Sequence, residues 1–445
     1  MAETMANREL SSSLISPSNV QQNGSSVRQS RPHIYELDPL RATTAIVVVL
    51  VHVLAFTAYL NRTTIGIEIQ NAAVIAVHYT REMFMFVTAF ALVYVYYGKP
   101  FSASRFFTRR ALGVLLPYCV WSLVYLLFNQ FVFHGQVQPT FGAFFSTLIY
   151  DIMTGRASYQ LYYILLTVQF YILFPLFLPF VSFIKKHPWS TLAVSFVLEL
   201  ILLYLDYHTL QRGEGAHSSF WQFISQYQDS IVFIYQFYFI LGALTALYLR
   251  QIFAFLQRFG WLTIIGFLGG IGALWIHFFI QILYYKEPMG YAVSVLQPIM
   301  VFYSLGTIAF FFWLAHLWAK NTTPATNPRS YKLWSTLSDA SFGVYLIHGL
   351  FLDWFMRWFV PGMPQIWPVA IRVLLTWFIT AGCAILASIV LMNIPVASRL
   401  VGRSSPPSRG IFPSRGILHS RQIKKIQPDI ENTSHVQKAL DSSSR

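Results

Sequence analysis

Two ionisable residues, Arg41 and His52, lie eleven positions apart in a largely apolar stretch. Eleven residues make about three helical turns, so both side chains would project from nearly the same helix face, about 16 Å apart along the axis. Inside a membrane an ionisable side chain costs at least about 2.5–3.5 kcal/mol, which makes such residues candidates for function. Because histidine exchanges a proton near neutral pH, His52 could act as a general base, with Arg41 at the mouth of the same stripe. A structural histidine bonded to a neighbouring helix is the alternative.

Other charged groups interrupt apolar stretches further along the chain. His348 is a second histidine within such a stretch and could face the first across a helical bundle, or be a packed and satisfied histidine. Arg81 and Glu82 are adjacent, within about one helical turn of His78. They form either an internal ion pair or a site that binds an acceptor substrate.

Arg109 and Arg110 directly precede another apolar stretch. Basic residues at this position commonly mark the cytoplasmic end of a membrane helix. Guanidinium groups also bind phosphates in a bidentate manner, so the pair could hold a nucleotide-bearing donor that arrives from the cytosol.

Motifs of soluble enzymes are missing from the sequence. It contains no glycine-rich phosphate loop, no dinucleotide fingerprint and no zinc-binding helix with paired histidines. The histidines are too scattered for a metal site, so we predict no metal.

The composition indicates the class of protein that positions the candidate site residues. The 445 residues are 55% hydrophobic and only 11% charged, with a formal net charge of +14. Soluble domains carry about 25% charged residues, so a water-facing surface could not be covered. The apolar content excludes a disordered chain, and two cysteines exclude a disulfide scaffold. The basic residues avoid the apolar bulk, which favours a membrane protein over a nucleic-acid-binding protein.

A helix needs about 20 mainly apolar residues to cross the hydrocarbon core. By this criterion the sequence predicts an all-α, polytopic membrane protein with ten transmembrane helices. The predicted spans cover residues 42–60, 72–97, 111–133, 161–183, 190–206, 231–249, 260–283, 297–318, 336–358 and 368–392. The segment 139–153 is predicted to be amphipathic and to lie against the membrane surface.

The basic residues predict the orientation. With the N-terminus in the cytoplasm, 24 of the 31 Lys and Arg residues fall in loops and tails on the cytoplasmic side, which predicts that both termini are cytoplasmic. We expect a disordered cytoplasmic tail over 1–33, the ten-helix domain over 34–398 and a disordered, basic cytoplasmic tail over 399–445. The second tail is either solvated or bound to anionic lipid head groups.

Four stretches of the sequence recur together in one known family. They are Glu36–Arg41 continuing to His52, Arg81–Phe86, Arg109–Tyr118 followed by Gln169–Pro175, and Ser341–His348. In this order the chain resembles the integral-membrane acyltransferases called acyltransferase 3, whose signature is an arginine, ten residues and a histidine. The resemblance extends over about residues 34–392.

The resemblance implies transfer of an acyl group, usually acetyl, from acyl-coenzyme A to a hydroxyl, or less often an amine, of a glycan or other cell-surface molecule. His52 would be the catalytic histidine and Arg41 its partner. Arg109 and Arg110 would lie near the donor entrance, and His348 would be the polar position of the penultimate helix. Each role follows from a match to the family's motifs.

The same resemblance implies the partners of the protein. Acyl-coenzyme A, most simply acetyl-coenzyme A, would be a co-substrate, with no cofactor bound permanently. The acceptor would be a glycan or lipid-linked saccharide, and the protein would lie among the lipids of a bacterial cytoplasmic membrane. We expect no nucleic-acid partner.

The chain departs from its relatives at two places. Thr88-Ala89 stands where relatives have Ser-Gly, and Leu166-Thr167-Val168 replaces a segment that in many relatives ends in glutamate. The second departure excludes a carboxylate role in the fourth span.

The arginines and the histidine would act together in one reaction. The arginines would hold the donor's phosphates while the thioester reaches His52, which could either deprotonate the acceptor hydroxyl or carry the acyl group. The main alternative function is a transporter or flippase for a glycan or lipid, although the two halves of the sequence show no convincing repeat. A membrane receptor or scaffold would not need Arg41 and His52 on one stripe.

Overall fold

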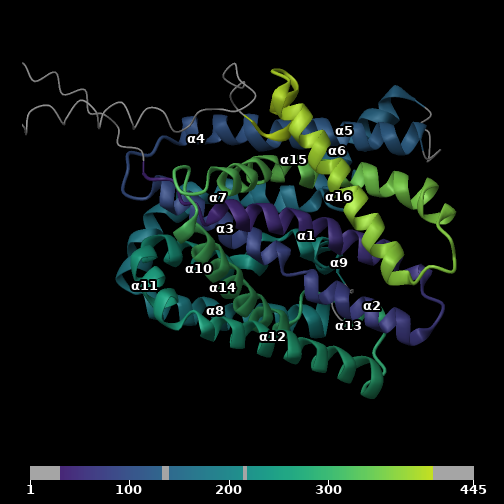
Figure 1. The fold of residues 1–445 in the computed structure, drawn as a ribbon, viewed down its shortest axis with the longest axis horizontal. Coiled ribbons are helices and arrows are strands. Elements are labelled where there is room, and N and C mark those ends of the chain that lie inside the picture. Colours follow the sequence, from purple (N-terminus) through teal and green to yellow (C-terminus); the bar gives the residue numbers. More distant parts are fainter. Residues whose placement is uncertain (1–30, 133–139, 214–217, 404–445) are drawn as a thin grey trace, which may run out of the picture. The chain divides into compact units, whose positions relative to one another are not determined.

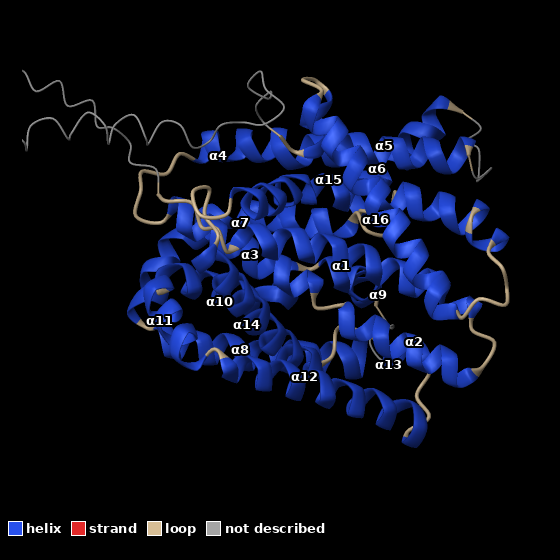
Figure 2. Cartoon of the chain, in the orientation of Figure 1, coloured by secondary structure: helices blue, strands red, loops and turns tan. Residues whose placement is uncertain are grey.

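The structure is a computed structural model that describes residues 31–132, 140–213 and 218–403. Every regular element in these ranges is a helix (Figure 2), which confirms the all-α prediction. The described residues from Ile34 to Arg403 form one packed unit. The predicted tails lie almost entirely outside the described residues.

The helices are connected by short loops and by 3-10 or π turns, which are labelled η. In chain order they are α1 (Leu37–Thr57), η1 (Ala58–Leu60), α2 (Thr64–Val77), α3 (Thr80–Tyr96), α4 (Ala103–Arg110), η2 (Ala111–Leu115), α5 (Leu116–Phe131), α6 (Phe141–Thr154), α7 (Tyr162–Lys186), α8 (Pro188–Leu205), η3 (Asp206–Leu210), α9 (Ser219–Tyr227), η4 (Gln228–Ser230), η5 (Val232–Tyr235), α10 (Gln236–Leu247), α11 (Leu249–Phe259), α12 (Trp261–Phe279), η6 (Ile280–Tyr284), α13 (Met289–Ala292), α14 (Pro298–Asn321), α15 (Pro328–Trp358), η7 (Val360–Gly362), α16 (Val369–Asn393) and η8 (Ala397–Val401).

Several of these segments are long and apolar enough to cross a membrane. Within the described ranges there are seven, and the bent pair formed by α9–η4 and η5–α10 would add an eighth. The seven are α1–η1, α4–η2–α5, α7, α8–η3, α12–η6, α14 and α16. Large apolar side chains on them, such as Leu176, Ile265 and Phe378, are exposed, as expected for a surface that faces lipid. The chain is therefore a multi-pass membrane protein, while the count of ten spans and the cytoplasmic termini remain predictions.

Two further helices differ from simple spans. α15 covers the predicted span 336–358 and is 31 residues long, but it is too polar to be among the seven. Several of its polar residues, including Ser338 and Ser341, are buried in the protein. α6 coincides with the predicted amphipathic segment and is shorter than a spanning helix.

α1 lies in the middle of the helices, with α15 and α5 above it and α14 and α12 below it in the view of Figure 1. It packs against α2, α3, α14, α15 and α16. The helix that carries Arg41 and His52 therefore has neighbours on several sides, and its side chains meet residues that are distant in sequence.

The prediction of one continuous helix over 72–97 is wrong. The chain forms two helices, α2 and α3, with a break at His78 and Tyr79. His78 Nδ1 hydrogen-bonds to the carbonyl oxygen of Val74 at 2.7 Å, which occupies the acceptor that a continuing helix would use. Glu82 lies in the first turn of α3, where the helix dipole favours negative charge. The break thus places Arg81 and Glu82 at a helix N-terminus.

A second interruption separates α9–η4 from η5–α10, which meet at an angle of 41°. Gln169 of α7 bridges the gap, since it donates to the Ser230 carbonyl at 2.6 Å and accepts from the Val232 N–H at 3.4 Å. Glu199 of α8 accepts a hydrogen bond from the Phe237 N–H at 3.2 Å, at the start of α10. Both side chains satisfy backbone groups that an interrupted helix leaves unpaired, which gives the buried Glu199 a structural role.

The departure at Thr88-Ala89 leaves α3 uninterrupted. Ala89 is fully buried and faces Gly242 of α10. A Cβ atom on Gly242 would lie 2.9 Å from the Ala89 Cβ and still closer to the carbonyl oxygen of Phe86. Small residues at these positions let the backbones of α3 and α10 approach each other, as is common between membrane helices.

The packed domain extends beyond the predicted boundary at residue 398. η8 is part of it, and Trp121 Nε1 of α5 donates a hydrogen bond to the Leu400 carbonyl at 2.9 Å. Residues 399–403 therefore belong to the helical domain instead of the predicted tail. The tail from residue 404 onward lies outside the described residues.

Candidate functional site

His52 and His348 meet at the contact between α1 and α15. Their imidazole rings stack with centroids 5.3 Å apart, so the two histidines do face each other across the bundle. The ring of Tyr159 lies 4.7 Å from that of His52. Neither ring nitrogen of His52 hydrogen-bonds to any residue in the described ranges, so no bond to a neighbouring helix accounts for this histidine. Its nitrogens are available to a substrate.

The orientation of His348 follows from one hydrogen bond. Its Nδ1 lies 3.1 Å from the carbonyl oxygen of Val344, one turn earlier in α15. A carbonyl only accepts, so the proton of the neutral ring is assigned to Nδ1 and the lone pair to Nε2. Nε2 is fully buried and has no partner among the described residues. A buried basic nitrogen without a partner is unusual and marks a position where a reacting group could bind.

A polar network holds this part of α15 in place. Tyr125 of α5 donates to the Leu346 carbonyl at 2.8 Å and accepts from Gln160 Nε2 at 2.6 Å. These two side chains fill the space beside Gly349, where a Cβ atom would lie 2.6 Å from Gln160 Nε2 and 2.7 Å from the Tyr125 hydroxyl. A side chain at position 349 would displace these two hydrogen-bonded groups, so Gly349 preserves the network that holds this turn of α15.

Three tyrosines near the start of α7 connect the histidine pair with the surrounding polar groups. Tyr159 packs on His52, Tyr162 accepts a hydrogen bond from Arg81 at 3.2 Å, and Tyr163 borders a large cavity. The hydroxyls of Tyr159 and Tyr163 are buried without partners in the part of the chain that the structure describes. This cluster, 158–163, was missed in the sequence, although its polar and tyrosine-rich composition at the start of a span was a usable signal.

The cavity has a volume of about 910 Å³ and is lined by all the predicted donor-binding residues, Arg41, Arg109 and Arg110. The basic side chains that line it are Arg41, Arg109, Arg110 and Arg403, and the one acidic residue among its described lining is Asp339. Neither histidine is in this lining. The link is Tyr345, which borders the cavity and whose ring lies 6.0 Å from that of His348.

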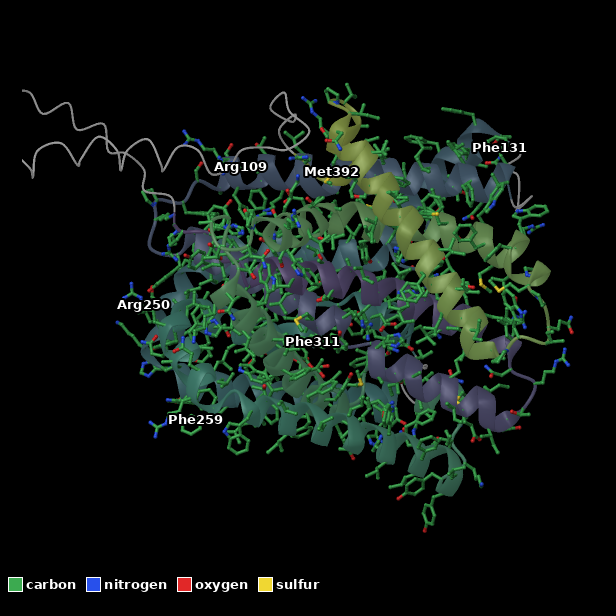
Figure 3. All side chains as sticks on the ribbon, viewed as in Figure 1. Arg109, Phe131, Arg250, Phe259, Phe311 and Met392 are labelled. Carbon is green, nitrogen blue, oxygen red and sulfur yellow. The ribbon has the colours of Figure 1, made fainter. Side chains whose placement is uncertain are left out.

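Arg110 is held at the cavity by aromatic rings. Its guanidinium carbon lies 4.8 Å from the ring centroid of Tyr171 and 5.4 Å from that of Phe106, within the range of cation–π attraction. Its Nε is buried without a hydrogen-bond partner in the described ranges. Arg109 is exposed and lies at the opposite end of the α4–η2–α5 rod from Phe131 (Figure 3). The pair combines a fixed guanidinium with a solvent-accessible one.

A π turn shapes the wall of the cavity. Pro117 lacks an N–H, so the Gly113 carbonyl loses the donor that a regular α-helix would supply. Over η2 the Leu116 N–H instead donates to the Ala111 carbonyl, five residues back. π turns are frequent at functional sites, and Gly113 lines the cavity.

Arg81 and Glu82 lie elsewhere, at the start of α3. Of the two alternatives left open for them, the internal Arg81–Glu82 ion pair is not formed, because Arg81 Nη1 pairs with Asp229 Oδ1 of η4 at 2.9 Å. Arg81 Nε and Nη2 and Glu82 Oε2 are buried and have no partners within the described ranges. The Arg81–Asp229 pair joins the two interrupted helices, and sequence reasoning missed Asp229.

The structure thus separates the predicted site residues into three places. His52 and His348 form a pair, Arg41, Arg109 and Arg110 line the cavity, and Arg81 and Glu82 stand apart. Among the described residues, no group of three or more His, Cys, Asp or Glu side chains could hold a metal ion.

Comparison with known proteins gives the family. The acyltransferase domain of the acyltransferase 3 family matches residues 34–392, which is most of the chain. No curated protein and no solved structure matches. The match covers α1 to α16 and includes both histidines and the cavity arginines of these helices. The chain therefore belongs to the acyltransferase 3 family of membrane acyltransferases.

Proposed function

We propose that the protein transfers an acyl group, most simply acetyl, from cytosolic acyl-coenzyme A to a hydroxyl of a glycan, lipid-linked saccharide or other cell-surface acceptor. The observation that carries the proposal is the stacked His52–His348 pair beside an arginine-lined cavity. The family supplies the reaction class. We place the protein in the cytoplasmic membrane of a bacterium, with the cavity open to the cytosol.

The donor would bind in the cavity. Coenzyme A carries several phosphate charges, and Arg41, Arg109 and Arg110 offer guanidinium groups that bind phosphate through paired hydrogen bonds. The acyl-pantetheine arm would extend past Tyr163 and Tyr345 toward the histidines. Tyr345 contacts both regions, which supports this path.

The histidines would handle the proton. The acceptor oxygen attacks the thioester carbon, the carbon–sulfur bond breaks, and coenzyme A leaves as the thiol. His52 takes the proton from the hydroxyl and returns it to the departing sulfur, so that charge is balanced over the turnover. The Nε2 lone pair of His348 accepts a hydrogen bond from a second hydroxyl of the acceptor and thereby orients the attacking one.

Arg81 and Glu82 are our proposed acceptor ligands. A sugar hydroxyl both donates and accepts hydrogen bonds, so it suits unpaired guanidinium N–H groups beside an unpaired carboxylate oxygen. Tyr162 supports this placement, since it contacts Arg81 and belongs to the same segment as Tyr159 at the histidine pair.

The test uses the full chain purified into lipid nanodiscs and incubated with labelled acetyl-coenzyme A and membrane glycans. We expect thioester cleavage and labelled glycan with the parent protein, and a loss of about 10²–10⁴-fold with His52→Ala. His277→Ala is the matched control, because this histidine also lies in a membrane helix, α12, but outside the site. Full activity of His52→Ala, or no cleavage and no labelling by the parent, would contradict the proposal.

One observation favours a second function, a glycan or lipid transporter. Two interrupted helices meet at Arg81 and Asp229, and interrupted helices often form the substrate sites of transporters. Proteoliposomes that contain a labelled lipid-linked saccharide separate the two functions. Translocation without acyl-coenzyme A supports the transporter, whereas acylation without translocation supports the enzyme.

A further inference from the structure

The chain turns back toward the cavity after the last long helix. η8 packs on α5 and α15, with Ser398 and Val401 almost completely buried. The Trp121–Leu400 hydrogen bond ties the segment to α5. Gly343 of α15 leaves room for it, because a Cβ atom there would lie 2.9 Å from Val401 Cγ1. The segment is therefore a packed part of the domain.

A helix-ending turn then directs the chain. Gly402 has a φ of +78°, which favours glycine, and a Cβ atom there would lie 2.6 Å from Phe342 Cδ1 and 2.9 Å from the Gly113 carbonyl oxygen. The Gly402 N–H donates to the Arg399 carbonyl at 3.2 Å and the Arg403 N–H donates to the Ser398 carbonyl at 3.0 Å. These two bonds form a Schellman motif, which fixes the backbone position of Arg403.

The turn places three successive residues, Val401, Gly402 and Arg403, in the lining of the cavity. Arg403 is thus a fourth cavity arginine, contributed by the opposite end of the chain from Arg41. Four guanidinium groups face one carboxylate, Asp339, among the described lining residues. This excess of positive charge suits a ligand with several phosphate charges.

We propose that Arg403 binds a phosphate group of the donor and that the segment 394–403 forms a wall of the donor site. The inference rests on the proposed function, since it takes the donor to be a coenzyme A thioester. It adds a ligand from beyond the residues that match the family domain, which end at 392. The wall also makes the site dependent on the Gly402 turn.

Binding measurements on the full chain in nanodiscs test the proposal. Coenzyme A, dephospho-coenzyme A and pantetheine are titrated into the parent, Arg403→Ala and Arg399→Ala. Arg399 is the matched control, because it lies in the same segment but is exposed and outside the cavity lining. Removing one charge-assisted contact typically weakens binding about 10- to 100-fold.

We expect this loss for coenzyme A with Arg403→Ala but not with Arg399→Ala, and no change for pantetheine, which has no phosphate. A loss that disappears with dephospho-coenzyme A assigns the contact to the 3′-phosphate, and a loss that persists assigns it to the pyrophosphate. Equal binding by both variants, or an equal loss for pantetheine, would overturn the role of Arg403. If the parent itself binds none of the three, the donor of the proposed function is wrong.

Discussion

The cavity and the start of α3 both contain arginines, but they differ in what surrounds the guanidinium groups. In the cavity, Arg110 is held by the rings of Phe106 and Tyr171, and the space in front of it is open. At the start of α3, the Arg81 side chain is only 7% exposed and pairs with Asp229. Aromatic rings attract a cation without neutralising it, whereas a carboxylate neutralises it.

This difference indicates two tasks for one residue type. Under the proposed function the cavity keeps its positive charge for the phosphates of the donor, while the Arg81–Asp229 pair is close to neutral and joins two interrupted helices. Tyrosines link the histidine pair to each region: Tyr345 borders the cavity, and the 158–163 segment contacts both His52 and Arg81. Three properties should therefore respond to different substitutions. They are the reaction rate at the histidines, donor binding in the cavity, and the stability that the Arg81–Asp229 pair provides.

The largest effect is expected for His348→Ala. The variant loses the buried Nε2 that we assign to a second hydroxyl of the acceptor, so kcat should fall about 10²-fold through misplacement of the attacking hydroxyl, while binding of coenzyme A stays within about twofold. Steady-state kinetics and donor titration on the same preparation measure both. A parallel loss of donor binding would show that the histidine pair and the cavity are not separable, and His277→Ala controls for a generic change in a membrane helix.

Asp229→Asn should act on stability. It leaves Arg81 buried without its counter-ion, which typically costs 3–5 kcal/mol for a fully buried pair, and about 2 kcal/mol is expected here because the Asp229 side chain is 53% exposed. Denaturation in detergent micelles measures the change. The double variant Arg81→Gln with Asp229→Asn should recover much of the loss, and Glu287→Gln, which breaks the exposed pair with Arg212, should cost less than about 1 kcal/mol. If Asp229→Asn does not lower the free energy of unfolding, the Arg81–Asp229 pair does not stabilise the fold, and the contrast with the cavity arginines is wrong.

Arg110→Ala should act on the donor. Loss of one phosphate-binding guanidinium is expected to raise the KM for acyl-coenzyme A about 10-fold and to leave the binding of pantetheine unchanged. Arg105→Ala is the control, because Arg105 is an exposed residue of the same helix outside the cavity lining. Equal KM values for the two variants would argue against donor phosphates in this cavity.

The smallest effect is expected for Tyr163→Phe. The hydroxyl is buried without a partner in the described ranges, so its removal should leave stability unchanged or slightly increased. A decrease in kcat/KM of about three- to tenfold would indicate that the hydroxyl contacts the substrate on its way to the histidines, through a hydrogen bond of about 1 kcal/mol. Unchanged kinetics would place the substrate path away from Tyr163.

Much of the site could be predicted from single residues but not from their contacts. His52 and His348 stand out because ionisable groups are costly inside apolar stretches, and Arg109 and Arg110 stand out as two adjacent guanidinium groups at the start of one. The break at His78 was missed, since a hydropathy scan at span length averages over one polar residue. The ion-pair alternative for Arg81 named only its neighbour Glu82, because the true partner, Asp229, is distant in sequence and nothing local connects the two.

The sequence by itself determined the class of the protein. Apolar runs of spanning length specify membrane helices, and the ordered motifs along the chain specify the acyltransferase 3 family. The membrane helices and the family membership depend on local composition and on the order of motifs, so both can be predicted without a structure. Only the tertiary structure decided which helix faces meet: the stacking of His52 on His348, the pairing of Arg81 with Asp229, and the return of Arg403 to the cavity. These contacts arise from packing and backbone turns between distant segments, such as the Gly402 turn and the close fit at Gly349, which no local pattern encodes.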